Sequence, residues 1–382
     1  MPRTIYLDYN ATTPLDPAVR DAMLPFLDGL WGNPSSIHSV GRQARAALDD
    51  ARERAAGFLG TKAGEIVFTS GGTESNNLAI FGTARRLKAR GRHLITSTVE
   101  HHAVLQCFDY LEAKEGFAVT RLPVDSEGGV SPEALKQALR PDTVLVSIMA
   151  ANNEIGTLQP VAELGALCRE REIVFHTDAV QWFGKERFEN IGQFNADLVS
   201  VCAHKFHGPK GAGLLYIRSP LHPDPILLGG AHEQERRAGT ENVATIVGLV
   251  EAMERFVRPP VFERAFLGVL TRELIGLLAK TDGVEFVGSP KNRLANTAAF
   301  VVRGADSIAL LAGLDLVGIC ASSGSACSAG SLEPSHVIAA IGLPQMAHSL
   351  VRFSLGRESS REEVPFAAAA FKEVVSRAQH GQ

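Results

Sequence analysis

The sequence predicts an α/β protein with a largely parallel sheet between helices, followed by a smaller α+β region. Two observations lead to this fold class. Short β-branched runs alternate with amphipathic segments from about residue 40 to residue 220, a pattern typical of strands joined by crossover helices. Beyond Pro259-Pro260 the pattern changes to one long helical segment and a few separated strands. We therefore expect a domain boundary near residue 259.

The elements follow in order along the chain. Residues 41–60 are expected to form a helix, because their apolar residues recur at helical spacing. Further helices are expected from about Val243 and over about 262–280. The strands of the large region are predicted at 65–69, 93–96, 143–148, 173–176, 196–201 and 213–217. Those of the smaller region are predicted at 284–287, 297–302 and 351–355.

The composition is that of an ordinary globular protein. The 382 residues are 45% hydrophobic and 21% charged, and the net charge is −4 without a basic run, so no nucleic-acid partner is indicated. No signal peptide is evident, and the longest apolar stretch, 308–321, is too short for a membrane span. Five cysteines without a C-x-x-C pair indicate a reducing cytoplasm, with neither disulfides nor a zinc site.

Polar residues follow the first three strands, at the edge where open α/β sheets bind ligands. Gly72 and Thr73 open a helix whose free N–H groups can bind a phosphate, although a capped helix start is the alternative. His101 can stack on an aromatic ligand or move protons, unless it is a surface polar residue. Asn153 can hydrogen-bond a ligand or simply form a turn.

Two charged residues follow the later strands. Asp178, after an apolar strand, needs a partner such as a protonated ring nitrogen, and Gln181 could reach the same ligand. Lys205 lies between two histidines and two apolar strands, where burial would make its amine a nucleophile able to bind a carbonyl. A structural or phosphate-binding lysine is the alternative. Together with the residues after the first strands, these groups predict a pyridoxal phosphate enzyme.

A cysteine among small polar residues is the second chemical feature. Cys327 lies in Ser322-Ser-Gly-Ser-Ala-Cys-Ser-Ala-Gly-Ser331, a composition typical of an exposed, mobile loop. Exposed cysteines are the reactive ones, and a tolerated surface thiol is the alternative. Cys107, Cys168 and Cys320 lie in apolar or helical contexts and are expected to be buried packing residues.

Motifs along nearly the whole chain resemble the NifS/IscS-type cysteine desulfurases, within the class V aminotransferase branch of fold-type I pyridoxal phosphate enzymes. The motifs are Tyr6-Leu-Asp-Tyr-Asn-Ala-Thr-Thr-Pro14, Gly32-Asn-Pro-Ser-Ser-Ile-His38, Gly72-Thr-Glu-Ser-Asn-Asn77, Val99-Glu-His101, Asn152-Asn-Glu-Ile-Gly156, His204-Lys205, Arg237-Ala-Gly-Thr240, Ser325-Ala-Cys-Ser328 and Val351-Arg-Phe-Ser-Leu-Gly356. The cysteine segment is the specific one. The resemblance implies an aspartate aminotransferase-like large domain with a mostly parallel seven-stranded sheet, over residues 15–258. Residues 1–14 and 259–382 would form the small domain.

The resemblance also implies an activity. L-cysteine would be converted to L-alanine, with a persulfide formed on Cys327 that supplies sulfur for iron–sulfur cluster assembly or other thio-cofactors. Lys205 would bind the cofactor aldehyde and move the substrate α-proton, and His101 would stack on the ring and assist proton transfer. Asn33 and Arg352 would bind the substrate carboxylate. The implied cofactor contacts are Gly72, Thr73, His101, Asn153, Asp178, Gln181, Cys202, His204, Lys205 and Thr240.

Partners and alternatives follow from the same resemblance. Thr240 would reach the phosphate of a neighbouring subunit, which implies a homodimer, and a sulfur-acceptor protein such as an iron–sulfur scaffold is expected. No resident metal is expected; Cys327 would at most contact an iron–sulfur cluster transiently. Cys202 stands where the family commonly has serine, and a thiol is a poorer hydrogen-bond donor. Either cofactor affinity would be weaker, or Ser200 or a water would substitute as a phosphate donor. The alternatives are a selenocysteine lyase or another class V enzyme, and a non-catalytic scaffold of the same fold.

Overall fold

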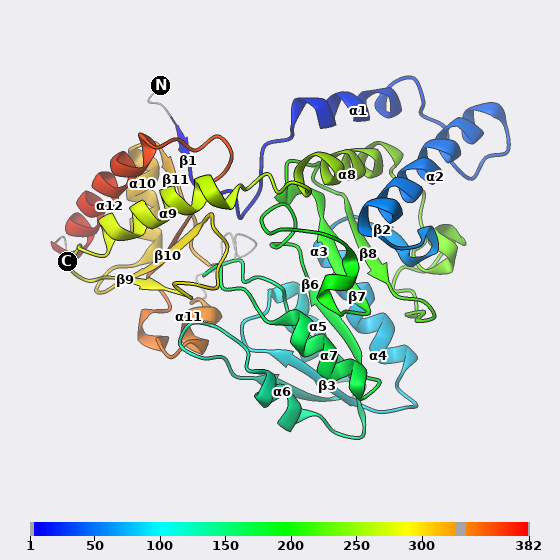
Figure 1. The fold of residues 1–382 in the computed structure, drawn as a ribbon, viewed down its shortest axis with the longest axis horizontal. Helices are drawn as coiled ribbons and strands as arrows, with labels where there is room; N and C mark the ends of the chain where they lie inside the picture. Colours follow the sequence, from blue (N-terminus) through cyan, green and yellow to red (C-terminus); the bar gives the residue numbers. More distant parts are fainter. Residues whose placement is uncertain (1–3, 325–333, 381–382) are drawn as a thin grey trace.

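The computed structural model describes residues 4–324 and 334–380 (Figure 1). Its larger part is built on a seven-stranded sheet with the strand order β2-β8-β7-β6-β5-β3-β4. Only β8 runs antiparallel to its neighbours, which confirms the predicted fold class. The strands are β2 (Ile66–Thr69), β3 (His93–Ser97), β4 (Ala118–Leu122), β5 (Thr143–Ser147), β6 (Val174–Asp178), β7 (Leu198–Cys202) and β8 (Gly213–Ile217).

Helices cover both faces of this sheet, which explains why its central strands are buried along almost their whole length. One face packs against the core side of α2 and α8, and the other against α4 and α5. The α2 helix ends at Gly60, whose φ of 72° is left-handed and suits glycine. The helices of this part are α1 (Pro17–Leu27), α2 (Ser39–Leu59), α3 (Gly72–Asn77), α4 (Thr83–Arg86), α5 (His102–Glu115), α6 (Pro132–Ala138), α7 (Val161–Glu170) and α8 (Val243–Phe256).

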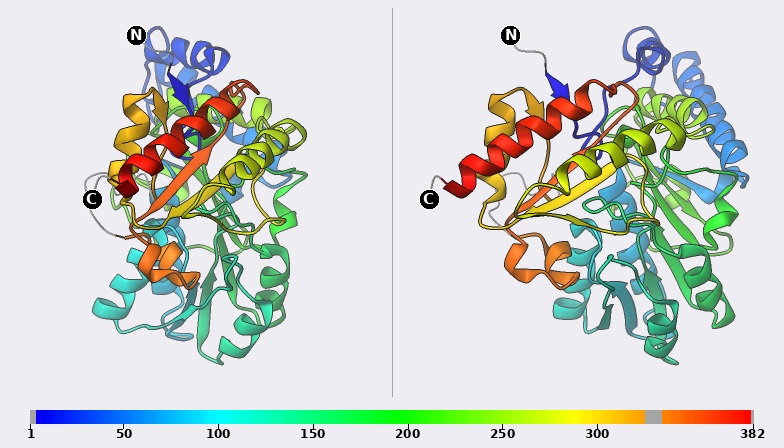
Figure 2. Two further views of the ribbon diagram at one scale, coloured as in Figure 1. Left: turned by 90° about the vertical axis from the view of Figure 1, so that its left-hand side faces the viewer. Right: turned by 60° about the vertical axis from the view of Figure 1, so that its left-hand side comes forward.

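The smaller part is built on an antiparallel sheet with the order β12-β10-β9. The helices α9 and α12 lie side by side against this sheet (Figure 2). Near the N-terminus, β1 (Ile5–Tyr6) pairs with β11 (Ile319–Cys320), so Ile5, Leu7 and Tyr9 join the hydrophobic core of residues 262–375. The other elements are α9 (Arg264–Leu278), β9 (Val284–Val287), β10 (Thr297–Val302), α10 (Ser307–Leu316), α11 (His336–Ala340), β12 (Leu350–Ser354) and α12 (Glu363–His380).

The predicted strands agree with the observed ones to within about two residues, but some observed strands were not predicted. The two-residue strands β1 and β11 are too short to give a pattern, and the edge strand β4 escaped prediction because its half-exposed sequence Ala-Val-Thr-Arg-Leu has no strong apolar run. The strand β6 extends to Asp178, whose backbone still pairs with Ser200 of β7, so the carboxylate lies on the strand and not after it. Among the described residues, no helix is long and apolar enough to cross a membrane.

Candidate active site

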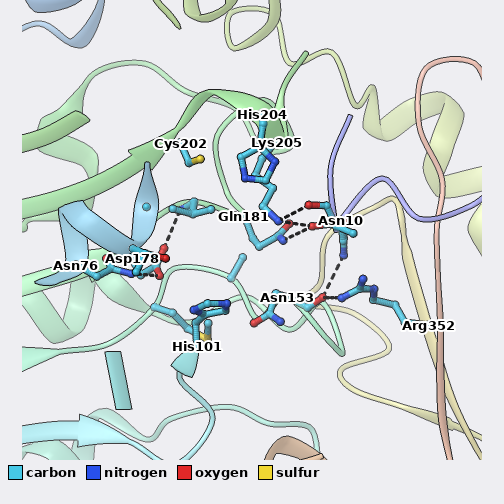
Figure 3. Close-up of a pocket in the computed structure, with 16 residues that line it drawn as sticks. Asn10, Asn76, His101, Asn153, Asp178, Gln181, Cys202, His204, Lys205 and Arg352 are labelled. Atoms are coloured by element: carbon cyan, nitrogen blue, oxygen red, sulfur yellow. Dashed lines mark hydrogen bonds between the residues drawn. The ribbon is translucent and has the colours of Figure 1, made fainter. Parts of the chain in front are cut away.

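A pocket lies at the carboxyl ends of the parallel strands, where the segment around Asn10 and β12 of the smaller part meet the large sheet (Figure 3). It brings together ten residues that the sequence singled out: Gly72, Thr73, His101, Asn153, Asp178, Gln181, Cys202, His204, Lys205 and Arg352. These residues come from segments spread over 281 positions of sequence, and the parallel topology gathers most of them at one edge.

Gly72 and Thr73 form the end of the pocket that suits an anion. The α3 helix begins at Gly72 without a side-chain cap and continues through a π-helical turn, η2 (Leu78–Gly82), into α4. The N–H groups of its first turn are therefore not covered by a capping side chain, and the helix dipole favours negative charge there. Glycine is required at this position, because a Cβ on Gly72 would lie 2.7 Å from Cγ2 of Val180.

Asp178 is a buried carboxylate held by two neutral donors. Its Oδ2 accepts a hydrogen bond from Nδ2 of Asn76 at 2.7 Å, and its Oδ1 accepts one from the backbone N of Val180 at 3.0 Å. Burial raises the pKa of this carboxyl. A cationic ligand atom beside Asp178 would offset the cost of burying its negative charge, because an adjacent positive charge favours the ionised carboxylate. The carboxylate therefore fits a protonated ring nitrogen.

Lys205 ends a short 3₁₀ turn, η4 (Ala203–Lys205), directly after β7. Its Nζ donates to the backbone oxygens of Asn10 at 2.7 Å and Ala11 at 2.8 Å, so the N-terminal segment fixes the amine inside the pocket (Figure 3). The same segment is tied to the turn by Thr13, whose backbone N donates to the oxygen of His204 at 3.0 Å. The amine of Lys205 is thus held by two backbone carbonyl oxygens. A ligand with a carbonyl group could bind the amine in place of these hydrogen bonds.

The two histidines of the pocket are held as neutral rings. His101 caps α5, because its Nδ1 accepts from the backbone N of Ala103 at 3.0 Å, which leaves the proton of the neutral ring on Nε2. Burial, and then the positive charge of Lys205, lowers the pKa of His101 to about 4. The same two causes lower the pKa of His204 to about 3.

Arg352 lies in β12 with a side chain that is 1% exposed, and its guanidinium reaches the pocket wall. Nη1 donates to the backbone oxygens of Asn153 at 2.7 Å and Gly324 at 3.2 Å, and Nη2 is paired with Asp8 Oδ1 at 2.9 Å. Among the described residues its buried Nε–H has no hydrogen-bond partner. A buried donor without a partner is costly, so this group fits a ligand acceptor such as a carboxylate.

Two residues proposed from sequence, Asn33 and Thr240, lie elsewhere in the described part of the chain. Asn33 and Thr240 are exposed and do not line the pocket of the single chain. Cys327 lies outside the described residues. The expectation that Ser200 substitutes for Cys202 is wrong, because the buried Ser200 hydroxyl is hydrogen-bonded to His176 Nε2 at 3.0 Å and does not line the pocket.

The other cysteines also differ in environment. Cys202 lines the pocket, and burial raises the pKa of its thiol. Cys107 and Cys168 are buried as predicted, and burial raises the pKa of each to about 12. Cys320 is only partly buried, contrary to prediction, because its two-residue strand lies at the margin of the smaller part.

Sequence reasoning gave no role to three residues that the structure places at this site. Asn10 hydrogen-bonds Lys205 and Gln181, Asn76 hydrogen-bonds Asp178, and Lys185 hydrogen-bonds Gln181. Asn10 and Asn76 both lie within motifs that carry the family resemblance, which was the available signal. Lys185 follows Gln181 by four residues, and only its position in an apolar turn could have indicated burial.

Comparison with known proteins gives a consistent result. The family model described as aminotransferase class-V matches residues 5–366. Cysteine desulfurase IscS of Dictyoglomus turgidum is 48% identical over 379 residues, which are 99% of this chain and 96% of that protein. Cysteine desulfurase NifS of Azotobacter vinelandii is 45% identical, over 94% of this chain and 90% of that protein.

Solved structures agree. A NifS-like protein superposes with a TM-score of 0.91 at 36% identity, covering 98% of this chain and all of the other. SspA in complex with cysteine superposes with a TM-score of 0.81 at 36% identity, covering 94% of this chain and all of the other.

Proposed function

This chain belongs to the aminotransferase class-V family, and from that premise we infer that it is a pyridoxal phosphate-dependent cysteine desulfurase. The identity to named cysteine desulfurases over nearly the full length supports this activity. The observation that carries the proposal is that a lysine amine, a buried carboxylate and a buried arginine converge on one pocket. One N–H of this arginine has no partner among residues 4–324 and 334–380. A substrate with amino and carboxylate groups, and a cofactor with a cationic ring, would satisfy all three.

Pyridoxal phosphate, when bound, supplies the aldehyde that joins amines and the ring that accepts the electrons left by proton removal. We propose that the N–H groups of Gly72 and Thr73, with His204, hold its phosphate. Asp178 would pair with the ring nitrogen, and Asn153 and Gln181 would contact the ring hydroxyl. The thiol of Cys202 is a weaker donor than the serine hydroxyl common in this family, so its contribution to phosphate binding would be small.

Within this site Lys205 would hold the cofactor and then move the α-proton of the substrate. An amine is suited to this task because the surrounding protein can shift the equilibrium between its charged and neutral forms. His101 would stack on the ring. Since its neutral ring carries the proton on Nε2, that atom could donate a proton to the substrate or accept one back after turnover. The carboxylate of the substrate would bind Arg352, assisted by Asn33.

The sulfur would leave through Cys327. As a thiolate it would attack the substrate sulfur, so that the sulfur–sulfur bond forms as the carbon–sulfur bond breaks and L-alanine is released after protonation. The pKa values of the described cysteines support this assignment indirectly. Burial raises the pKa of Cys107, Cys168 and Cys202, and also that of Cys320, so all four favour the less nucleophilic thiol.

We further propose that the protein acts as a homodimer and passes its persulfide sulfur to an acceptor protein such as an iron–sulfur scaffold. Large exposed apolar side chains within about twelve positions of Asn33 or Thr240 in the sequence support a dimer. Leu27, Trp31, Ile37 and Leu228 are 63%, 73%, 90% and 84% exposed, and such exposure is typical of interaction surfaces. Thr240 would then reach the phosphate of the neighbouring copy.

Light scattering during size-exclusion chromatography should therefore give twice the mass of one chain. Trp31→Glu places a charge among these apolar side chains and should shift the protein toward the monomer. A wild-type protein that stays monomeric at micromolar concentration would contradict the dimer, while leaving the reaction itself untested.

The activity is tested by incubating the purified holoprotein with L-cysteine and a thiol reductant. We expect L-alanine and sulfide in equal amounts. A protein that carries the cofactor but forms no alanine from cysteine would refute the proposed substrate, and selenocysteine would then be the next compound to test.

Arg352→Lys should weaken cysteine binding more than it slows turnover. The lysine keeps the charge but loses the planar fork that binds a carboxylate through two hydrogen bonds, so we expect KM to rise about 10- to 100-fold with a smaller fall in kcat. Steady-state kinetics measures both. Arg303→Lys, an exposed arginine of the smaller part, is the matched control and should leave both constants unchanged. A purely structural Arg352 would predict an unchanged KM in the folded variant.

A further inference from the structure

Lys185 is a buried lysine beside the candidate active site, and the proposed reaction gives it no role. Its side chain is 1% exposed. Burial, followed by the positive charges of Lys205 and Arg352, lowers its pKa well below the usual value for lysine. A methionine of similar length would avoid the cost of burying an amine. The presence of lysine must therefore be explained by what its amine binds.

The partners of Lys185 are two amide oxygens and an aromatic ring. Its Nζ donates to Oδ1 of Asn10 at 2.8 Å and to Oε1 of Gln181, and it lies 5.3 Å from the ring centroid of Phe262. Asn10 and Gln181 both line the pocket, and Gln181 precedes Lys185 by four residues in the turn after β6. Lys185 thus lies directly behind two groups of the pocket wall.

These hydrogen bonds fix the orientation of both amides. In both amides the atom that faces the amine is the oxygen, and the amine donates to it. The amide nitrogens must then point away. Nε2 of Gln181 donates to the backbone oxygen of Asn10 at 2.8 Å, and Nδ2 of Asn10 donates to Oγ1 of Thr297 at 2.9 Å. Nε2 of Gln181 carries a second N–H, and this N–H can donate to a ligand in the pocket.

The same contacts extend to Lys205. The backbone oxygen of Asn10 accepts from Nζ of Lys205 at 2.7 Å (Figure 3). The side-chain oxygen of the same residue accepts from Lys185. A single residue therefore connects the two lysines. Without the amine of Lys185, Oε1 of Gln181 would lose this donor, and Oδ1 of Asn10 would keep only Nδ2 of Asn296, which donates to it at 3.1 Å. The side chains beside the acceptors of Lys205 would then be held less firmly.

We propose that Lys185 is a positioning residue of the cofactor site, which holds Gln181 with an N–H toward the cofactor ring and the Asn10 carbonyl against Lys205. The proposal rests on the proposed function only for the identity of the cofactor, and it does not depend on cysteine being the substrate. It concerns how tightly and in what environment pyridoxal phosphate is bound.

The test compares Lys185→Met with wild type in the holoprotein and after cofactor removal. Methionine fills similar space and removes the cost of burying an amine, but it also takes a donor from the buried amide oxygens of Asn10 and Gln181; because these two effects oppose each other, the thermal midpoint of the cofactor-free protein should stay close to that of wild type. We expect the dissociation constant for pyridoxal phosphate to rise about tenfold, because the hydrogen bonds that hold Asn10 and Gln181 in the pocket wall are lost. The absorption maximum of the bound cofactor should also shift. Lys136→Met, an exposed lysine on α6, controls for the loss of one charge and should match wild type.

A double-mutant cycle identifies the route of the effect. If Lys185 acts through Gln181, then Lys185→Met should weaken cofactor binding far less in the Gln181→Ala background than in wild type. Full additivity, or wild-type affinity and spectrum in Lys185→Met, would overturn the proposal. If Lys185→Met does not fold, Lys185→Gln carries the same comparison, since glutamine can present either amide atom and no longer fixes its neighbours. These readouts are cofactor binding and absorbance, so they remain valid even if no alanine is formed from cysteine.

Discussion

Lys205→Ala should abolish turnover, with L-alanine formation falling about 10³-fold or more. The variant loses both the amine that would join the cofactor and the base that would move the α-proton, and each role alone contributes orders of magnitude. Alanine formation from L-cysteine measures the loss. Borohydride reduction of the wild-type holoprotein should also fix the cofactor on the peptide that contains Lys205, which mass spectrometry detects.

Lys210→Ala is the matched control, because this exposed lysine lies only five residues further along the same loop. It should retain activity and the same reduced-cofactor peptide. If the cofactor were recovered on Lys185 and not on Lys205, the roles assigned to the two lysines would have to be exchanged. Undiminished activity of Lys205→Ala would refute the mechanism.

Cys327→Ala should lose sulfur transfer while it keeps the cofactor. The thiolate is the only proposed acceptor of the substrate sulfur, so alanine formation should fall by about 10²-fold or more. The absorbance spectrum of the bound cofactor should be unchanged, because the pocket described above does not depend on this side chain. Intact-protein mass spectrometry after brief exposure to cysteine should show one added sulfur atom in wild type and none in the variant.

Cys320→Ala separates this role from a general need for thiols in the same region. Cys320 precedes Cys327 by seven residues and is a partly buried thiol paired through its backbone with Tyr6. Its replacement should leave both alanine formation and the added sulfur intact. If Cys327→Ala formed alanine at the wild-type rate, the nucleophile would have to be another group, and Cys202 in the pocket wall would be tested first.

Much of the fold could be predicted because it depends on local patterns. The buried strands β5, β6 and β7 are short runs that contain Val, Leu or Phe, and helices on both sides of the sheet leave them no face toward solvent. The pocket residues that end or follow these strands could be predicted for the same reason: in a parallel sheet, the carboxyl ends of the strands lie at one edge. Asp178, His101 and Lys205 are therefore positioned by the topology, and their chemical types indicate the cofactor.

Only the tertiary structure decided how residues of the N-terminal segment and the smaller part complete the pocket at the carboxyl edge of the large sheet. Asn10, from the N-terminal segment, contacts Lys205, Gln181 and Lys185, and Arg352 reaches the pocket from β12. Lys185 lacks any sequence pattern of its own, since a lysine is expected at the surface unless burial is known. The sequence by itself thus determined the family, the sheet and the groups at its edge. The hydrogen bonds between distant segments, which orient those groups, depend on packing across hundreds of residues that no local pattern encodes.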